Sequence, residues 1–203
     1  MSVHIKICGI TDRAAARAVV DAGVDAVGFV LAPSVRQITA HEASVIASDL
    51  PDRIDKVAVF RNPPPEDIVG ALKEFAADVV QADFSSLADL GSPRLLPVFR
   101  ETTASRVLIA DQVDGGRFLF EGPNSGMGRT VDWKVAADIA LLGQMTLAGG
   151  LDPDNVAEAI RTVKPFGVDV SSGVESSPGV KDPSRIRAFV EAAREAEKDL
   201  VRP

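Results

Sequence analysis

Two glycine-bearing turns in the C-terminal part of the chain could together bind a phosphate group. The first turn is Gly149-Gly150-Leu151 and the second is Ser171-Ser172-Gly173, and each follows a short apolar run. Glycine lets backbone N–H groups close around an anion, and Asp152-Pro153 predicts a helix start that would add the positive end of a helix dipole. We therefore predict a phosphate site at Gly149, Gly150, Ser172 and Gly173.

A thiol and an ammonium group lie close together in the first apolar run, His4–Cys8. Because the side chains of a strand alternate between its faces, Ile5 and Ile7 share one face, and Lys6 and Cys8 share the other. The ammonium group could favour the thiolate, which would let Cys8 act as a general base. The alternative of an inert, buried cysteine stays open at this point.

Strand-like and helix-like patterns alternate along the chain, which predicts repeated parallel strand–helix units. The strand-like runs are His4–Cys8, Ala26–Leu31, Lys56–Phe60, Asp78–Gln81, Leu95–Phe99, Arg117–Phe120, Met145–Leu147 and Val168–Val170. The helix-like stretches are Asp12–Ala22, Ala40–Asp49, Pro65–Ala76, Asp132–Leu142, Asp154–Val163 and Pro183–Lys198, with the weakest patterns near Ser86–Leu90 and Ser105–Gln112.

A phosphate site formed after the seventh and eighth strands is typical of an eight-fold barrel. We therefore predict an α/β protein, a single-domain (β/α)8 TIM barrel with eight parallel strands that covers residues 1–203. A doubly wound open sheet would give a similar alternation of elements and is the alternative fold.

Composition narrows the class of partner. The net charge is −7 and the pI is about 4.9, and basic residues do not cluster with aromatic ones, which argues against a nucleic-acid surface. Cys8 is the only cysteine, so a reducing compartment is expected. The sequence contains no apolar run of about 18 residues, so no membrane span is predicted. We expect a cytoplasmic protein with a small-molecule partner, and leave its oligomeric state open.

Several motifs, in order along the chain, resemble those of phosphoribosylanthranilate isomerase. They are Lys6–Thr11, Gly28-Phe29, Leu147–Leu151, Asp169–Glu175 and Pro178–Asp182. The resemblance implies a (β/α)8 barrel of tryptophan biosynthesis that isomerises N-(5-phosphoribosyl)anthranilate. It also implies that the reaction needs neither a cofactor nor a metal ion.

The reaction of this family is an Amadori rearrangement, in which an acid protonates the furanose ring oxygen and a base removes the C2 proton. The resemblance implies that Cys8 is the base. It places the acid at Glu121, where the family has an aspartate that is one methylene shorter. It makes Arg36 the expected cation for the anthranilate carboxylate or a neighbouring group.

Other positions depart from the family or have an open role. Asp83 stands where the family commonly has a histidine, which predicts added negative charge at the mouth of the barrel. In the segment 125–130, Arg129 stands where lysine is frequent. Lys6 and Asp169 are expected at the substrate pocket, where a structural ion pair is favoured over a direct catalytic role of Asp169.

Two alternative functions follow from these departures. Asp83 would repel an anthranilate carboxylate placed near it, which would suit a diverged paralogue that isomerises another phosphorylated sugar. A non-catalytic module that binds a phosphorylated metabolite is the other alternative. The presence of both Lys6 and Cys8 counts against that second alternative.

Overall fold

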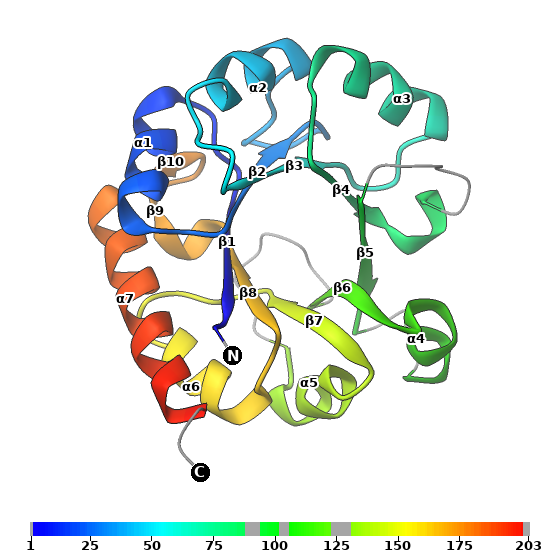
Figure 1. Ribbon diagram of the computed structural model, residues 1–203, viewed down its shortest axis with the longest axis vertical. Helices are drawn as coiled ribbons and strands as arrows, with labels where there is room; N and C mark the ends of the chain where they lie inside the picture. The colour runs from blue at the N-terminus through cyan, green and yellow to red at the C-terminus, as the bar shows by residue number, and fades with distance from the viewer. Residues whose placement is uncertain (1, 88–93, 102–105, 123–130, 201–203) are drawn as a thin grey trace.

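A computed structural model describes residues 2–87, 94–101, 106–122 and 131–200 of the chain. Eight parallel strands form a closed barrel in the order β1 to β8, with helices around it (Figure 1). The strand β1 closes the barrel by pairing with β8, with Lys6 opposite Asp169. The predicted barrel is therefore confirmed, and the alternative of an open sheet is excluded.

Each predicted strand-like run overlaps one observed strand, with ends that differ by a few residues. The strands are β1 (His4–Cys8), β2 (Ala26–Val30), β3 (Asp55–Val59), β4 (Val79–Asp83), β5 (Arg94–Arg100), β6 (Gly115–Glu121), β7 (Gly143–Ala148) and β8 (Gly167–Val170). A short hairpin of β9 (Glu175–Ser177) and β10 (Val180–Lys181) follows the barrel.

Seven α-helices lie in the described residues. They are α1 (Arg13–Ala22), α2 (Ala40–Ala47), α3 (Pro65–Glu74), α4 (Arg106–Val113), α5 (Trp133–Ala140), α6 (Val156–Val163) and α7 (Pro183–Leu200). Among these helices, none is long and apolar enough to cross a membrane.

Two predictions about helices need correction. The helix predicted near Ser86–Leu90 is a single 3-10 turn, η1 (Phe84–Ser86), in the part that the structure describes, and residues 88–93 lie outside that part. The helix start predicted at Asp152-Pro153 is wrong, because α6 begins at Val156. The Asp152 carboxylate instead accepts hydrogen bonds from the backbone N–H groups of Asp154 and Asn155, which stabilises a turn before the helix.

Local sequence signals fix where other helices begin and end. The Asp12 carboxylate caps α1 by accepting a hydrogen bond from the Ala15 N–H, and Gly23 ends this helix in the left-handed conformation with φ 78°. Thr39 and Glu42 form a reciprocal capping box at the start of α2. These caps fix the start of both helices and the end of α1.

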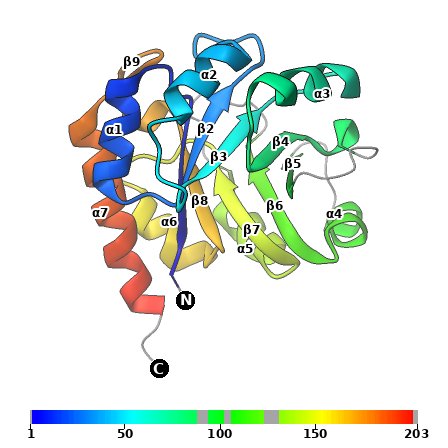
Figure 2. The same ribbon diagram turned by 45° about the horizontal axis from the view of Figure 1, so that its top comes forward.

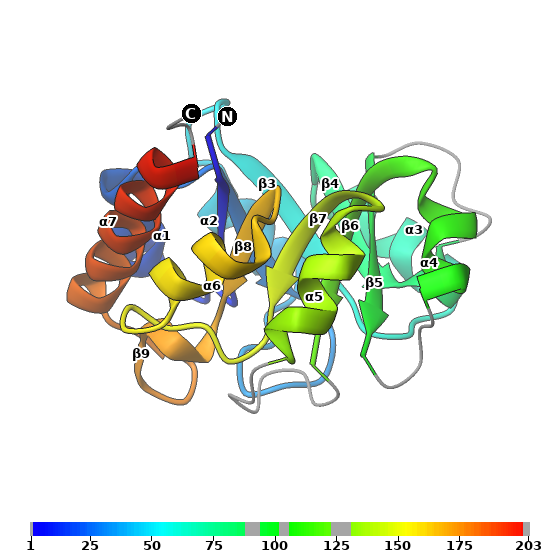
Figure 3. The same ribbon diagram turned by 90° about the horizontal axis from the view of Figure 1, so that it is seen from below.

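Two apolar layers hold the barrel together. The larger one lies between strands and helices and includes Ile5, Ile7 and Phe29. The smaller one lies inside the barrel and includes Cys8 and Leu119. Because the strands are parallel, their C-terminal ends gather at one end of the barrel, and the start of β1 and the end of α7 lie toward the opposite end (Figures 2 and 3).

Candidate active site

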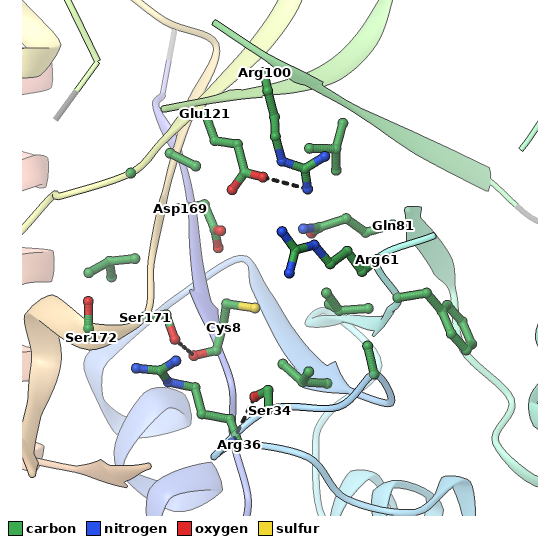
Figure 4. Close-up of a pocket in the computed structure, with 18 of the residues that line it drawn as sticks. Cys8, Ser34, Arg36, Arg61, Gln81, Arg100, Glu121, Asp169, Ser171 and Ser172 are labelled. Carbon is green, nitrogen blue, oxygen red and sulfur yellow. Dashed lines mark hydrogen bonds and ion pairs between the residues drawn. The ribbon is translucent and has the colours of Figure 1, made fainter. Parts of the chain in front are cut away.

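The C-terminal ends of the barrel strands surround a cavity of about 240 Å³. Its polar and charged lining residues are Cys8, Ser34, Arg36, Arg61, Gln81, Arg100, Glu121, Asp169, Ser171 and Ser172 (Figure 4). Gly149 and Gly150 of the first predicted turn also line it. Of the other residues predicted for the site, Lys6, Asp83 and Gly173 are not among the residues that line this cavity.

The predicted inward face of β1 is confirmed. The Lys6 ammonium is buried and lies 2.8 Å from Oδ1 of Asp169, which comes from the neighbouring strand β8. This ion pair agrees with the structural pairing that the sequence favours. Gly28 on β2 leaves room for the two side chains, because a Cβ atom there would lie 2.8 Å from Cys8 Sγ and 3.1 Å from Lys6 Nζ.

Burial raises the pKa of the Cys8 thiol above its ordinary value, although Lys6 and Lys181 act in the opposite direction. Lys6 lowers the pKa of Cys8, in the direction that the sequence predicts, but burial outweighs this effect. Asp169 explains part of the difference, because its negative charge also raises the pKa of Cys8. For Lys6, burial lowers the pKa, but the charges of Asp169 and Cys8 outweigh it, and the net pKa is raised.

Glu121 lies at the end of β6 and is part of a chain of charged side chains. Its Oε1 is 2.9 Å from Nη2 of Arg100, and Nη1 of the same arginine is 2.7 Å from Oδ1 of Asp83. Arg100 thus lies between the two carboxylates that depart from the family's residues. The negative charge predicted at Asp83 is present, but it is paired with a cation.

The carboxylate of Glu175 fixes the guanidinium group of Arg36 in place. Its Nε and Nη2 donate hydrogen bonds of 2.7 and 2.9 Å to the two carboxylate oxygens of Glu175. Lys181 donates to the same carboxylate at 2.7 Å. Burial raises the pKa of Glu175, but the hydrogen bonds from Arg36 and Lys181 outweigh it and lower the net pKa to about 2. Lys181 also donates to the backbone oxygen of Ser171, which links this cluster to the second turn.

The two predicted phosphate turns lie next to each other. Gly149 and Gly150 adopt left-handed φ values of 94° and 67°, which favour glycine. A Cβ atom on Gly173 would lie only 1.9 Å from the backbone oxygen of Leu151, so the second turn packs directly on the first. Within the described residues, no group accepts a hydrogen bond from the N–H groups of Gly150, Ser172 or Gly173. These N–H groups are available to an anion.

Known proteins are similar to this chain in both sequence and fold. A family model described as N-(5'phosphoribosyl)anthranilate (PRA) isomerase matches residues 5–192. An N-(5'-phosphoribosyl)anthranilate isomerase of Oceanobacillus iheyensis is 38% identical over 98% of this chain and 100% of its own length. The crystal structure of TrpF from Jonesia denitrificans is 38% identical, with a TM-score of 0.82, over 97% of this chain and 98% of its own.

The chain belongs to the PRA isomerase family. This membership confirms the resemblance inferred from the motifs. The protein is an isomerase of the intramolecular oxidoreductase class in tryptophan biosynthesis. A crystal structure of a phosphoribosyl anthranilate isomerase with 31% identity and a TM-score of 0.82, covering 95% of this chain and 99% of its own, contains reduced 1-(o-carboxyphenylamino)-1-deoxyribulose 5-phosphate.

Sequence reasoning missed several residues that line or support the site of this PRA isomerase. They are Arg61, Gln81, Arg100, Glu175 and Lys181. Arg61 and Arg100 could have been found from their positions just after β3 and at the end of β5, because barrel active sites lie at such ends. The glycine-rich segment 125–130, with Arg129, lies outside the described residues.

Proposed function

We propose that the protein catalyses the Amadori rearrangement of N-(5-phosphoribosyl)anthranilate to the corresponding 1-deoxyribulose 5-phosphate. The observation that carries this proposal is that Cys8 and Glu121 line one cavity together with Gly150 and Ser172. The reaction requires an anion site for the phosphate at one end of the sugar, and an acid and a base near C1 and C2 at the other end. A single cavity with a carboxyl group, a thiol and two turns with available N–H groups meets these requirements.

The substrate phosphate binds at the turns after β7 and β8. The N–H groups of Gly150, Ser172 and Gly173 have no acceptor among the described residues, which supports their donation to phosphate oxygens. Backbone donors of this kind do not change their protonation state, so they fix one end of the substrate at any working pH. The sugar carbons are then directed toward the cavity walls at β1 and β6.

Glu121 acts as the general acid and Cys8 as the general base. Glu121 gives its proton to the ring oxygen as the C1–O bond breaks, which opens the ring to a protonated Schiff base. The thiolate form of Cys8 then takes the C2 proton, the electrons of the C2–H bond form the C1–C2 double bond, and the electrons of the C=N bond return to nitrogen. The resulting enolamine gains a proton at C1 and loses the proton of its C2 hydroxyl group, which gives the ketone. Arg100 stabilises the carboxylate that Glu121 becomes, and Lys6 stabilises the thiolate form of Cys8.

Arg36 is the proposed cation for the anthranilate carboxylate. Glu175 fixes its orientation through two hydrogen bonds, so the guanidinium group is pre-arranged at the cavity wall. The pairing of Asp83 with Arg100 favours the ordinary family reaction over a diverged paralogue, because a paired carboxylate repels a substrate anion less than an isolated one does.

We also propose that the protein works in the cytoplasm as a small-molecule enzyme, without nucleic acid or a membrane as its partner. Its net charge of −7 supports this. A reducing compartment preserves the Cys8 thiol, which oxidation to a sulfenic acid would remove as a base.

The test is complementation of a tryptophan auxotroph that lacks this isomerase, followed by a rate measurement with purified protein. The proposal expects growth and turnover of N-(5-phosphoribosyl)anthranilate by the unaltered protein. Failure of the soluble, folded protein to turn this substrate over would overturn the proposed function and favour the paralogue.

A further inference from the structure

A second cavity, of about 280 Å³, lies in the barrel toward the N-terminal ends of the strands. Most of its lining residues come from the first half of a strand, such as His4 of β1, Ala26 of β2 and Asp55 of β3. Cys8, at the end of β1, lines the active-site cavity instead, and none of the described residues lines both. A ligand in this N-terminal cavity would therefore occupy a site separate from the proposed catalytic one.

The inner wall of the N-terminal cavity is apolar. Ala26, Val57, Val79 and Leu96 line it, and each of these residues is buried. They belong to the apolar layer inside the barrel. The wall would remove the apolar part of a ligand from water, which favours binding of a molecule with an apolar body.

Two guanidinium groups at this cavity share one carboxylate. Nη2 of Arg94 is 2.6 Å from Oδ1 of Asp55, whereas Nη1 of Arg117 is 4.0 Å from Oδ2 of the same aspartate. Lys6 also lines the cavity, but its ammonium is paired with Asp169 on the side of the active site. Two arginines against one aspartate leave an excess of positive charge at the N-terminal cavity.

Arg117 has donors to spare for a ligand. Its guanidinium carbon lies 4.8 Å from the centre of the Phe166 ring, and this cation–π contact helps to hold the group in place. Phe166 supplies no acceptor oxygen from its ring, and no side chain or backbone group of the described residues accepts a hydrogen bond from the Arg117 guanidinium. An arginine that is held in place without a close carboxylate is suited to bind an anion.

The positive charge of Arg117 is only partly compensated by its surroundings. Burial lowers the pKa of Arg117, Asp55 raises it and Arg94 lowers it further, and the net pKa is lowered. Burial and the charge of Arg117 likewise lower the pKa of His4, so this imidazole is neutral near pH 7. A bound anion would supply the missing negative charge.

We propose that the N-terminal cavity is a second ligand site, which binds a small carboxylate with an apolar body. Arg117 and Arg94 bind the carboxylate group, and the wall that includes Val57 and Leu96 covers the apolar body. A monoanion matches the excess of positive charge, and a planar carboxylate matches the geometry of guanidinium donors. This site goes beyond the proposed function, because binding there requires no turnover of a substrate.

The test measures the binding of benzoate by isothermal titration, with benzamide as a neutral molecule of similar shape. The unaltered protein should bind benzoate about tenfold or more tightly than benzamide, because only benzoate carries the negative charge. Arg117→Met should remove most of this preference. Arg117→Lys should recover part of it, because lysine restores the charge without the bidentate geometry.

Asp55→Asn should change the affinity in the opposite direction. It removes the carboxylate that competes for both arginines and repels the ligand, so benzoate should bind several-fold more tightly. Arg53→Met is the matched control, because Arg53 is an exposed arginine just before β3 that does not line the cavity. The control should leave benzoate affinity unchanged.

Arg36→Met separates the two cavities, because Arg36 lines only the active-site cavity. Binding that is lost in Arg36→Met and kept in Arg117→Met would place benzoate in the active site and overturn the inference. Equal affinity for benzoate and benzamide, or an affinity that neither Arg117→Met nor Asp55→Asn changes, would overturn it as well. A loss in Arg117→Met together with a gain in Asp55→Asn supports it. These results are independent of turnover, so they stand even if the proposed function fails.

Discussion

The two sides of the barrel's C-terminal end, around the cavity, are built from different groups. After β7 and β8, the turns present backbone N–H groups on glycines that the packing enforces, since Gly173 has no room for a Cβ atom. After β4 to β6, Asp83, Arg100 and Glu121 form a chain of charged side chains. Single substitutions can change side-chain charges, whereas backbone donors depend on the fold. Substitution is therefore expected to alter the second side more readily than the first.

The largest expected effect lies in the two proton-transfer groups. Cys8→Ser and Glu121→Gln should each lower kcat by about 100-fold or more, because general acid–base groups contribute that order. Binding of inorganic phosphate, measured by isothermal titration, should stay unchanged in both variants, since the turns supply that binding. Near-normal turnover by a folded Cys8→Ser protein would remove Cys8 from the role of base.

Glu121→Asp sharpens the assignment of the acid. It keeps a transferable proton and restores the residue type of the family, so we expect it to retain much more turnover than Glu121→Gln. If both variants lose the same share of kcat, the longer glutamate side chain is needed for the ion pair with Arg100. The loss of kcat would then come mainly from the broken ion pair and less from the missing transferable proton.

The next effect tests the phosphate end. Gly150→Ala places a side chain at φ 67° and should weaken both phosphate and substrate binding about tenfold. Gly23→Ala is the control, because Gly23 has a similar φ of 78°, has nothing within 4 Å of an added Cβ atom and lies at the end of α1. Equal phosphate affinity in the two variants, measured by titration, would show that the anion binds elsewhere.

A smaller effect is expected at Asp83. Asp83→Asn removes the charge that Arg100 contacts at 2.7 Å, and it should lower kcat a few-fold by changing the position of Arg100 against Glu121. The KM for the anthranilate substrate should change little. A rise in turnover in Asp83→Asn or Asp83→His would instead indicate that the carboxylate repels this substrate, and would favour a diverged paralogue.

The smallest expected effect is the loss of folding stability in acid from the ion pairs of Glu175 with Arg36 and Lys181. The pKa of Glu175 is lowered from 4.5 to about 2, so its ion pairs stabilise the folded state above pH 4.5 and lose this contribution as the pH falls toward 2. In urea unfolding, we expect the gap in unfolding free energy between the unaltered protein and Glu175→Gln to shrink on going from about pH 6 to about pH 3. A gap that stays constant over this range would contradict the lowered pKa.

Much of the barrel follows from the sequence because its signals are local. Short apolar runs predict each strand, and alternation along β1 places Lys6 and Cys8 on the inner face. The two glycine turns are also a local signal. A backbone with positive φ favours glycine, so the glycines themselves indicate the turns at which we predict the phosphate site. The short region after β4 is predicted less well, because its pattern is weak and one 3-10 turn replaces the expected helix in the described residues.

The sequence by itself thus determined the type of fold, the family and the position of the thiol. Only the tertiary structure decided which charges meet. Arg36 and Glu175 are 139 positions apart, and no local pattern pairs them or links Asp83 to Glu121 through Arg100. It also decided the sign of the pKa shift of Cys8. That sign depends on how burial compares with the charges of Lys6 and Asp169, and burial is set by the closed barrel as a whole.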